Sequence, residues 1–283
     1  MNTLGVHAFV WVGGWSHADC DRAISKTVEA GFDLLEITAM DPAAIDIDYT
    51  RRALDRSGLK SSVSLGLSPE TDINSEDRAT VAAGHRMLTT ALDVVEGIGS
   101  RYLCGVIYSA LTKYSTPTTP AARANSAAVI KEIAQDAARR EISLGLEFVN
   151  RYVTNLINTV SETLAFMDEI DEPNVFVHAD TYHMNIEETD FRSPILLCAD
   201  RLGYVHIGES NRGYLGAGTI DFDSFFGALL DVGYSGPVTF ESFSSAVVGP
   251  QLSNALGVWR DLWSDSMDLA VNAREFMITR MGA

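Results

Sequence analysis

The sequence predicts an α/β protein, a (β/α)8 TIM barrel. Apolar segments with the composition of buried β-strands alternate with helical stretches along the whole chain. The strand segments are almost continuously apolar, which is typical of parallel strands covered by helices. Eight such units fit within 283 residues, a usual length for a closed barrel. No linker or low-complexity stretch divides the sequence, so we expect one domain over residues 1–283.

The expected elements follow one another in alternation. Strands are expected at Leu4–Trp11, Leu34–Met40, Ser61–Leu67, Arg101–Tyr108, Ser143–Val149, Asn174–Asp180, Tyr204–Glu209 and Pro237–Ser242. Helices are expected near His17–Ala30, Pro42–Ser57, Ser75–Ile98, Ala121–Arg140, Asn158–Ile170, Thr189–Ala199, Phe222–Val232 and Gln251–Arg280. In the third helix apolar residues recur at helical spacing, and Ser75 is its expected cap.

Composition argues against several classes of protein. The net charge of −17 opposes binding to the phosphates of nucleic acids or to anionic membranes. Cys20, Cys104 and Cys198 are scattered and odd in number, so neither a disulfide framework nor a thiolate metal site is expected. No segment approaches ~18 uninterrupted apolar residues, and the first residues do not resemble a signal peptide. We therefore expect a cytoplasmic protein.

Four ionisable residues, Glu147, Asp180, His206 and Glu241, lie at the carboxyl ends of the last four predicted strands. The carboxyl ends of barrel strands surround a common mouth, so these side chains can converge there. Ionisable groups are costly to bury unless they are paired or bound to a cation. An oxygen-rich set with one imidazole suits Mn²⁺, Co²⁺ or Mg²⁺ better than a structural zinc ion. Ordinary ion pairs are the plainer alternative, less favoured for four consecutive strands.

The motifs around these residues resemble those of a known family. The segments LEFVNRY, HADTYHMN, VHIGESNRGYLGAGTIDF and VTFESFSS are similar to the ketose 3-epimerases, which include D-tagatose, D-allulose (psicose) and L-ribulose 3-epimerases. These enzymes are xylose-isomerase-like barrels. The order Glu, Asp, His, Glu, at gaps of 33, 26 and 35 residues, is similar to the family pattern. The similarity covers nearly the whole chain and is strongest from residue 144 to 245.

This resemblance implies metal-dependent epimerisation at C3 of free ketoses, such as D-allulose/D-fructose, D-tagatose/D-sorbose and L-ribulose/L-xylulose. It implies that Glu147, Asp180, His206 and Glu241 bind one divalent ion, Mn²⁺ foremost, with Co²⁺ or Mg²⁺ as alternatives. Glu147 and Glu241 would also be the catalytic acid and base, acting through a cis-enediolate. A homodimer or homotetramer is implied as well.

The resemblance also implies the substrate contacts. These are His183 and Arg212 on sugar oxygens, Gly66, Trp15 and Phe243 in the pocket wall, and His7 at the end of the first strand. His7 stands where the family often has an aromatic residue. Val153 stands where it often has a glutamate that touches the O1/O2 end of the sugar, so substrate preference is expected to differ. The plainer interpretations are a backbone-bonded loop histidine, a solvated arginine and core aromatics.

The glycine-rich segment GYLGAG, residues 213–218, does not match a phosphate-binding fingerprint. A turn before a helix capped by Asp221 explains it more simply. Arg212 is the only lysine or arginine from Leu202 to Trp259, so we expect a free sugar rather than a sugar phosphate as substrate.

Other functions remain open at this point. An aldose–ketose isomerase, similar to hydroxypyruvate or rhamnose isomerase, would use the same barrel with a metal and carboxylates. A nuclease similar to endonuclease IV would need more histidines and less negative charge, and a non-catalytic sugar-binding barrel would not need the four ionisable residues. Near the carboxyl terminus, Leu256, Trp259, Leu262 and Trp263 could form a subunit interface or pack against the barrel.

Overall fold

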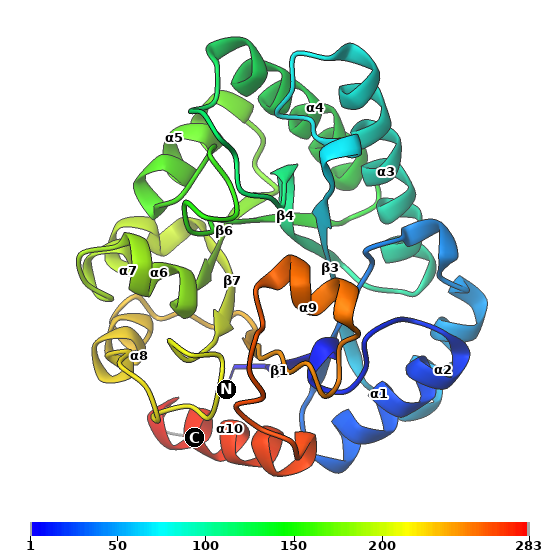
Figure 1. Ribbon diagram of the computed structural model, residues 1–283, viewed down its shortest axis with the longest axis vertical. Helices are drawn as coiled ribbons and strands as arrows, with labels where there is room; N and C mark the ends of the chain where they lie inside the picture. Colours follow the sequence, from blue (N-terminus) through cyan, green and yellow to red (C-terminus); the bar gives the residue numbers. More distant parts are fainter. Residues whose placement is uncertain (1, 282–283) are drawn as a thin grey trace.

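Eight parallel strands close into a barrel in sequence order, and β8 pairs with β1 to complete it. The computed structural model describes residues 2–281, except for the side chains of residues 251 and 255. Helices lie between successive strands and surround the barrel (Figure 1). The predicted (β/α)8 barrel is therefore confirmed.

Most elements differ from the predicted ones at their ends, and the short helix Thr181–Glu187 was not predicted. The strands are β1 (Leu4–His7), β2 (Leu34–Thr38), β3 (Lys60–Leu67), β4 (Tyr102–Ala110), β5 (Ser143–Glu147), β6 (Val175–Asp180), β7 (Leu202–Ile207) and β8 (Val238–Phe240). The α-helices are α1 (His17–Glu29), α2 (Ile47–Ser57), α3 (Arg78–Gly97), α4 (Pro120–Arg139), α5 (Val160–Ile170), α6 (Thr181–Glu187), α7 (Ser193–Cys198), α8 (Phe222–Asp231), α9 (Pro250–Leu256) and α10 (Ser266–Met281).

The first strand is shorter than predicted, because His7 ends it. The Nδ1 atom of His7 accepts a hydrogen bond from the backbone N–H of Phe9 at 3.2 Å. This contact begins a short 3₁₀ helix, η1 (Ala8–Val10).

The predicted cap of the third helix is wrong. Asp77 caps α3 by accepting the N–H of Thr80 at 3.0 Å, while the Ser75 hydroxyl accepts the N–H of Asp77.

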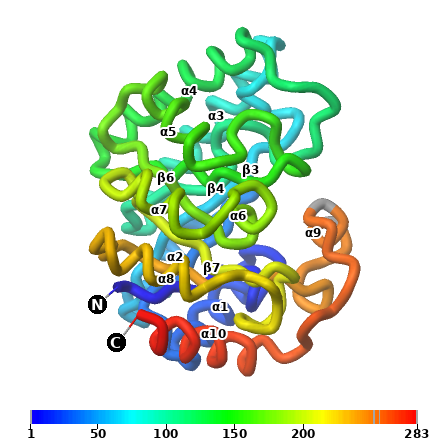
Figure 2. The backbone as a smooth tube through the Cα atoms, turned by 90° about the vertical axis from the view of Figure 1, so that its left-hand side faces the viewer, coloured from blue at the N-terminus to red at the C-terminus, as the bar shows by residue number. Residues whose placement is uncertain are grey.

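The predicted last helix is divided into α9 and α10. α9 is capped by Gly257, whose φ of 67° is in the left-handed region that favours glycine. The loop that follows returns Trp263 to the interior, where its Nε1–H donates to Ser242 Oγ at 2.7 Å. α9 stands out from the rest of the chain, on the side away from both termini (Figure 2).

The barrel interior is filled by paired polar groups as well as by apolar side chains. The Tyr204 hydroxyl lies 2.7 Å from Ser62 Oγ and 2.7 Å from Thr239 Oγ1. One large cluster of buried apolar side chains, contributed by strands and helices, joins the barrel to its helices. The three cysteines are buried, and none forms a disulfide within the described residues. Within residues 2–281, no helix combines the length and the hydropathy needed to cross a membrane.

Candidate active site at the barrel mouth

The structure brings together the four ionisable residues that the sequence places at strand ends. Glu147 and Asp180 are the last residues of β5 and β6, His206 lies near the end of β7, and Glu241 directly follows β8. All four side chains are buried, and one possible ligand atom from each lies within 4.8 Å of the others. The Nδ1 atom of His206 lies 3.4 Å from Glu147 Oε1, 3.7 Å from Glu241 Oε1 and 3.9 Å from Asp180 Oδ2.

This group of side chains fits a cation. Asp180 uses one oxygen to cap α6, accepting the N–H of Tyr182 at 2.6 Å. Its other oxygen, Oδ2, is buried and has no hydrogen-bond partner among the described residues, and the same holds for His206 Nδ1. Burial alone would lower the pKa of His206, but Glu36, Glu241 and Glu147 together raise it well above its usual value. These three carboxylates therefore favour a positive charge in the space that His206 Nδ1 faces.

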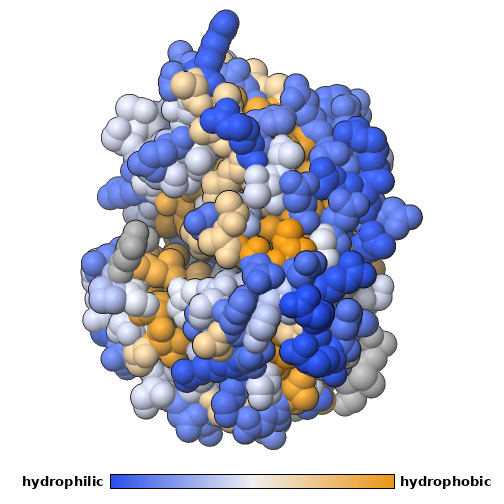
Figure 3. Space-filling model, turned by 90° about the vertical axis from the view of Figure 1, so that its right-hand side faces the viewer, coloured by the Kyte–Doolittle hydropathy of each residue, from blue (hydrophilic) through white to orange (hydrophobic). Residues whose placement is uncertain are grey.

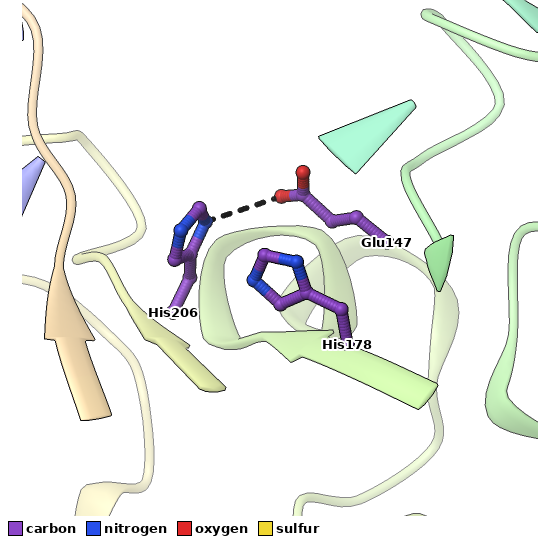
Figure 4. A group of neighbouring side chains, drawn as sticks. All are labelled: Glu147, His178 and His206. Carbon is purple, nitrogen blue, oxygen red and sulfur yellow. Dashed lines mark ion pairs between the residues drawn. The ribbon is translucent and has the colours of Figure 1, made fainter. Parts of the chain in front are cut away.

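Two further buried ionisable residues border this group and were not predicted. Glu36 of β2 lies inside the barrel, with Oε2 2.8 Å from His206 Nε2. His178 of β6 lies beside His206 and close to Glu147 (Figure 4), and it can form an alternative ligand group with these two residues. Neither ring nitrogen of His178 has a hydrogen-bond partner within the part of the chain that the structure describes. Burial lowers the pKa of His178 well below its usual value, so its ring is neutral.

The sequence holds a signal for each of these two residues. His178 precedes Asp180 by two positions in one strand, so both side chains point to the same side of the barrel wall. Glu36 is a lone charge within the apolar segment LLEIT, and such a charge is rarely buried without a partner.

The two glutamates of the group lie in different electrostatic environments. Burial raises the pKa of Glu147 to about 7, although His206 acts in the opposite direction. Burial would raise the pKa of Glu241 too, but Arg212 and His206 hold it below its usual value. Arg212 donates a hydrogen bond to Glu241 through Nη1, and the same nitrogen lies 3.5 Å from Asp180 Oδ2.

Arg212 is held in place by its neighbours. Its guanidinium lies 3.9 Å from the ring centroid of Tyr182 and 4.8 Å from that of Phe243, so it is stacked between two aromatic residues. Its backbone has a φ of 60°, in the left-handed region. The buried carboxylate of Glu209 organises the loop that contains it, accepting the N–H groups of Ser210 and Gly216 at 2.8 Å each. The glycine-rich segment is therefore a loop folded around a carboxylate.

His183 is fixed in a similar way. Its Nδ1 accepts the backbone N–H of Asn150 at 3.1 Å, so the plainer interpretation of a backbone-bonded histidine describes one of its nitrogens. The other nitrogen, Nε2, lies 3.8 Å from Asp180 Oδ2 and 3.5 Å from Arg212 Nη2. Burial lowers the pKa of His183 to about 3, so the ring is neutral.

A cavity of about 680 Å³ opens beside these side chains. Its lining includes most of the predicted substrate contacts and both positions that depart from the family pattern, His7 and Val153. The other predicted contacts in the lining are His183, Arg212, Gly66 and Phe243. A hollow with hydrophobic side chains at its walls is visible at the left edge of the face shown in Figure 3. The loop after α9 contributes Val258, Trp259 and Leu262 to the same lining.

The structure corrects one predicted wall residue, Trp15. It is not among the described residues that line the cavity, and its Nε1–H donates to Thr50 Oγ1 of α2 at 3.1 Å. The next residue, Ser16, caps α1, so Trp15 lies where the chain enters the outer helix layer.

The four apolar residues near the carboxyl terminus differ in their surroundings. Trp263 is buried, while Trp259 is 74% exposed at the cavity mouth.

Known proteins share this fold and sequence over nearly the whole chain. The model of the xylose isomerase-like TIM barrel family matches residues 24–269. An L-ribulose 3-epimerase of Methylomonas sp. (strain DH-1) is 52% identical over 98% of this chain and 96% of its own. A ketose 3-epimerase of Arthrobacter globiformis is 50% identical over 99% of this chain and 97% of its own.

A crystal structure agrees with these sequence relatives. The D-allulose 3-epimerase from Methylomonas sp., in complex with D-allulose, superposes with a TM-score of 0.97 at 52% identity, covering 99% of this chain and 97% of that one. Both the sequence similarity and the shared arrangement of the barrel thus extend over nearly the whole chain. The chain belongs to the xylose isomerase-like TIM barrels and, among them, to the ketose 3-epimerase family of enzymes.

Proposed function

We propose that this protein interconverts free ketoses that differ in configuration at C3, with Glu147 and Glu241 moving the proton. The observation that carries the proposal is the convergence of these two buried carboxylates, from β5 and β8, on one cation-compatible group of side chains. The names of the relatives support the reaction, because those at 52% and 50% identity are an L-ribulose and a ketose 3-epimerase.

The proposed holders of a divalent ion are Glu147, Asp180, His206 and Glu241. When bound, the ion would polarise the ketone and stabilise the negative charge that develops as C3 loses its proton. Mn²⁺ is the proposed ion, with Co²⁺ or Mg²⁺ as alternatives, because a set of carboxylate oxygens with one imidazole suits these ions.

The two glutamates divide the proton transfer between them. One carboxylate takes the C3 proton from one face of the sugar, which leaves a cis-enediolate, and the other returns a proton to the opposite face. C3 is thereby inverted, and the two roles exchange when the reaction runs backwards. Glu147 and Glu241 come from strands separated by β6 and β7, which supports their placement on two sides of one substrate.

Arg212 and His183 would bind the hydroxyl groups of the sugar. Both line the cavity, and both are held by neighbours, so little conformational freedom is lost when a substrate binds. The only other lysine or arginine among the described lining residues is Arg260. Because Arg212 is already engaged with Glu241 and Asp180, a phosphate would find little free positive charge, which supports an unphosphorylated ketose.

The test follows a hydrogen at C3. Protein stripped of metal with a chelator is given Mn²⁺, Co²⁺ or Mg²⁺ and incubated in D₂O with D-fructose, D-tagatose or L-ribulose, and the products are identified by NMR. We expect metal-dependent formation of the C3 epimer with deuterium at C3. Formation of aldoses instead would indicate the aldose–ketose isomerase, and turnover without any metal would contradict the proposal.

A matched pair of variants assigns the chemistry to the site. Glu147→Gln should remove epimerisation, while Glu141→Gln, which alters an exposed ion pair with Arg101, should leave it unchanged.

Three further expectations from the sequence remain proposals. These are a single-domain chain, a cytoplasmic location and a homodimer or homotetramer, for which the exposed Trp259 and Leu262 are candidate contacts.

A further inference from the structure

Glu36 is a buried carboxylate that lies outside the proposed ligand group but contacts one of its members. It stands in the middle of β2 and is 0% exposed. Its carboxylate approaches the imidazole ring of His206 from the side opposite to the ligand group. Its Oε2 lies 2.8 Å from His206 Nε2. A carboxylate in the middle of an apolar strand is costly to bury, so its retention calls for a physical reason.

The contact determines which nitrogen of His206 faces the ligand group. An ionised carboxylate can only accept hydrogen bonds, so His206 Nε2 carries a hydrogen and donates it to Glu36. The other nitrogen, Nδ1, points toward Glu147, as Figure 4 shows, and also lies near Asp180 and Glu241. With an ion present, Nδ1 is then the nitrogen whose lone pair is available.

We propose that Glu36 is a positioning residue, which holds His206 in the Nε2–H tautomer and in the ring orientation that presents Nδ1 to the cation. Such a carboxylate beside a metal-binding imidazole fixes the ring and makes it a better ligand. The inference rests on the proposed function only in assuming that this group binds a cation.

His7 supports the same arrangement from the neighbouring strand. His7 and Glu36 are paired in the register of β1 and β2, so both side chains enter the barrel side by side. Because Phe9 donates its N–H to His7 Nδ1, the hydrogen of the neutral ring is on Nε2. That nitrogen lies 3.7 Å from Glu36 Oε1 and 3.8 Å from Glu241 Oε1. The donor therefore faces the carboxylate oxygen of Glu36 that His206 does not use.

The experiment measures ion binding rather than turnover. Chelator-treated wild-type protein, Glu36→Gln, Glu36→Asp and Tyr204→Phe are titrated with Mn²⁺ alone, without sugar, by calorimetry. Glu36→Gln should weaken Mn²⁺ binding by about 10–100-fold. Glu36→Asp keeps the charge but shortens the side chain by one methylene, and it should weaken binding to a comparable extent.

Tyr204→Phe is the matched control, because it removes only a buried hydroxyl that bonds Ser62 and Thr239 and keeps the ring that lies edge-on to His206. It should bind Mn²⁺ as the wild type does. Wild-type affinity in Glu36→Gln would overturn the proposal, and so would wild-type affinity in Glu36→Asp, which would show that charge and not position matters. Absence of Mn²⁺ binding in the wild type would instead overturn the cation site of the proposed function.

A second measurement needs no variant that might fail to fold. In the Mg²⁺-loaded wild-type protein, two-bond ¹H–¹⁵N correlation spectra report which nitrogen of each histidine carries the hydrogen. We expect the Nε2–H tautomer for His206. The Nδ1–H tautomer would overturn the proposal, whatever the variants do.

Discussion

The two halves of the barrel differ in the side chains that they place at its mouth. Strands β5–β8 carry the proposed ligand group, and Arg212 and His183 follow β7 and β6. The part of the cavity wall formed by β3 and β4 is instead uncharged and partly made of backbone, with Ser64 and Gly66 from β3 and Gly105 from β4. Under the proposed function, one half would hold the ion and move protons, while the other would leave room for the carbon chain of a sugar.

Two close contacts show how the halves are built and where they meet. Glu36 of β2 contacts His206 of β7 across the interior, so a residue from the first half of the barrel reaches the proposed ligand group of the second half. The part of the wall formed by β3 and β4 depends on close contact between the backbones of these two strands. A Cβ atom at Gly105 would lie 2.4 Å from the carbonyl oxygen of Leu65, and the φ of Gly105 is 105°.

The largest expected effect comes from the two glutamates of the charged half. Glu147→Gln and Glu241→Gln should each lower kcat by about 10²–10⁴-fold, because each removes a proton-transferring group. Their effects on stability should differ, since Glu241→Gln also removes the carboxylate that Arg212 contacts and should cost about 2 kcal/mol more. Turnover with Mn²⁺ checks the first statement, and urea unfolding in the presence of chelator checks the second. Equal stability of the two variants would contradict the proposed asymmetry.

Arg212 is the next test of the same half. Arg212→Lys should lower kcat/KM by about tenfold or more despite keeping the charge, because lysine lacks the planar group that stacks on Tyr182 and bonds Glu241. Arg201→Lys, at a partly exposed ion pair with Asp168, is the control and should change kcat/KM little. Steady-state kinetics decides, and near-wild-type values in Arg212→Lys would show that charge alone is sufficient.

The uncharged half is tested by two glycines that both line the cavity. Gly105→Ala should destabilise the fold by about 1–3 kcal/mol, because its φ is strained for alanine and the methyl group would meet backbone. Gly66→Ala would place a methyl group 3.1 Å from the side chain of Leu111, which can move aside. It should therefore retain the fold and raise KM. Denaturant unfolding distinguishes the two variants. Equal destabilisation by both would contradict this interpretation of the cavity wall.

The smallest effect is expected where the two halves meet below the mouth. Tyr204 of β7 bonds Ser62 of β3 and Thr239 of β8, so Tyr204→Phe leaves two buried hydroxyl groups with fewer partners. The cost in unfolding free energy should be about 1 kcal/mol, with kcat unchanged. A loss of activity together with stability would mean that the mouth and the interior are coupled more closely than the contacts indicate.

The sequence by itself determined the barrel and the members of the four-residue group. Buried parallel strands are continuously apolar, and a charge at the end of such a strand is conspicuous, so both signals are local. Helix ends were less well determined, because the cap of α3 depended on which of Ser75 and Asp77 reached the right amide. The division of the last helix depended on how Trp263 returns to the interior.

Only the tertiary structure decided which residues meet across the barrel. Glu36 and His206 are 170 positions apart, and closure of the sheet brings them to 2.8 Å. Trp15 was predicted in the pocket wall, yet it precedes the cap of α1 and bonds Thr50 of α2, so it lies in the helix layer. Periodicity and strand ends are properties of a few consecutive residues. Contacts through the barrel depend on strand order, register and burial, which arise only when all eight strands have closed.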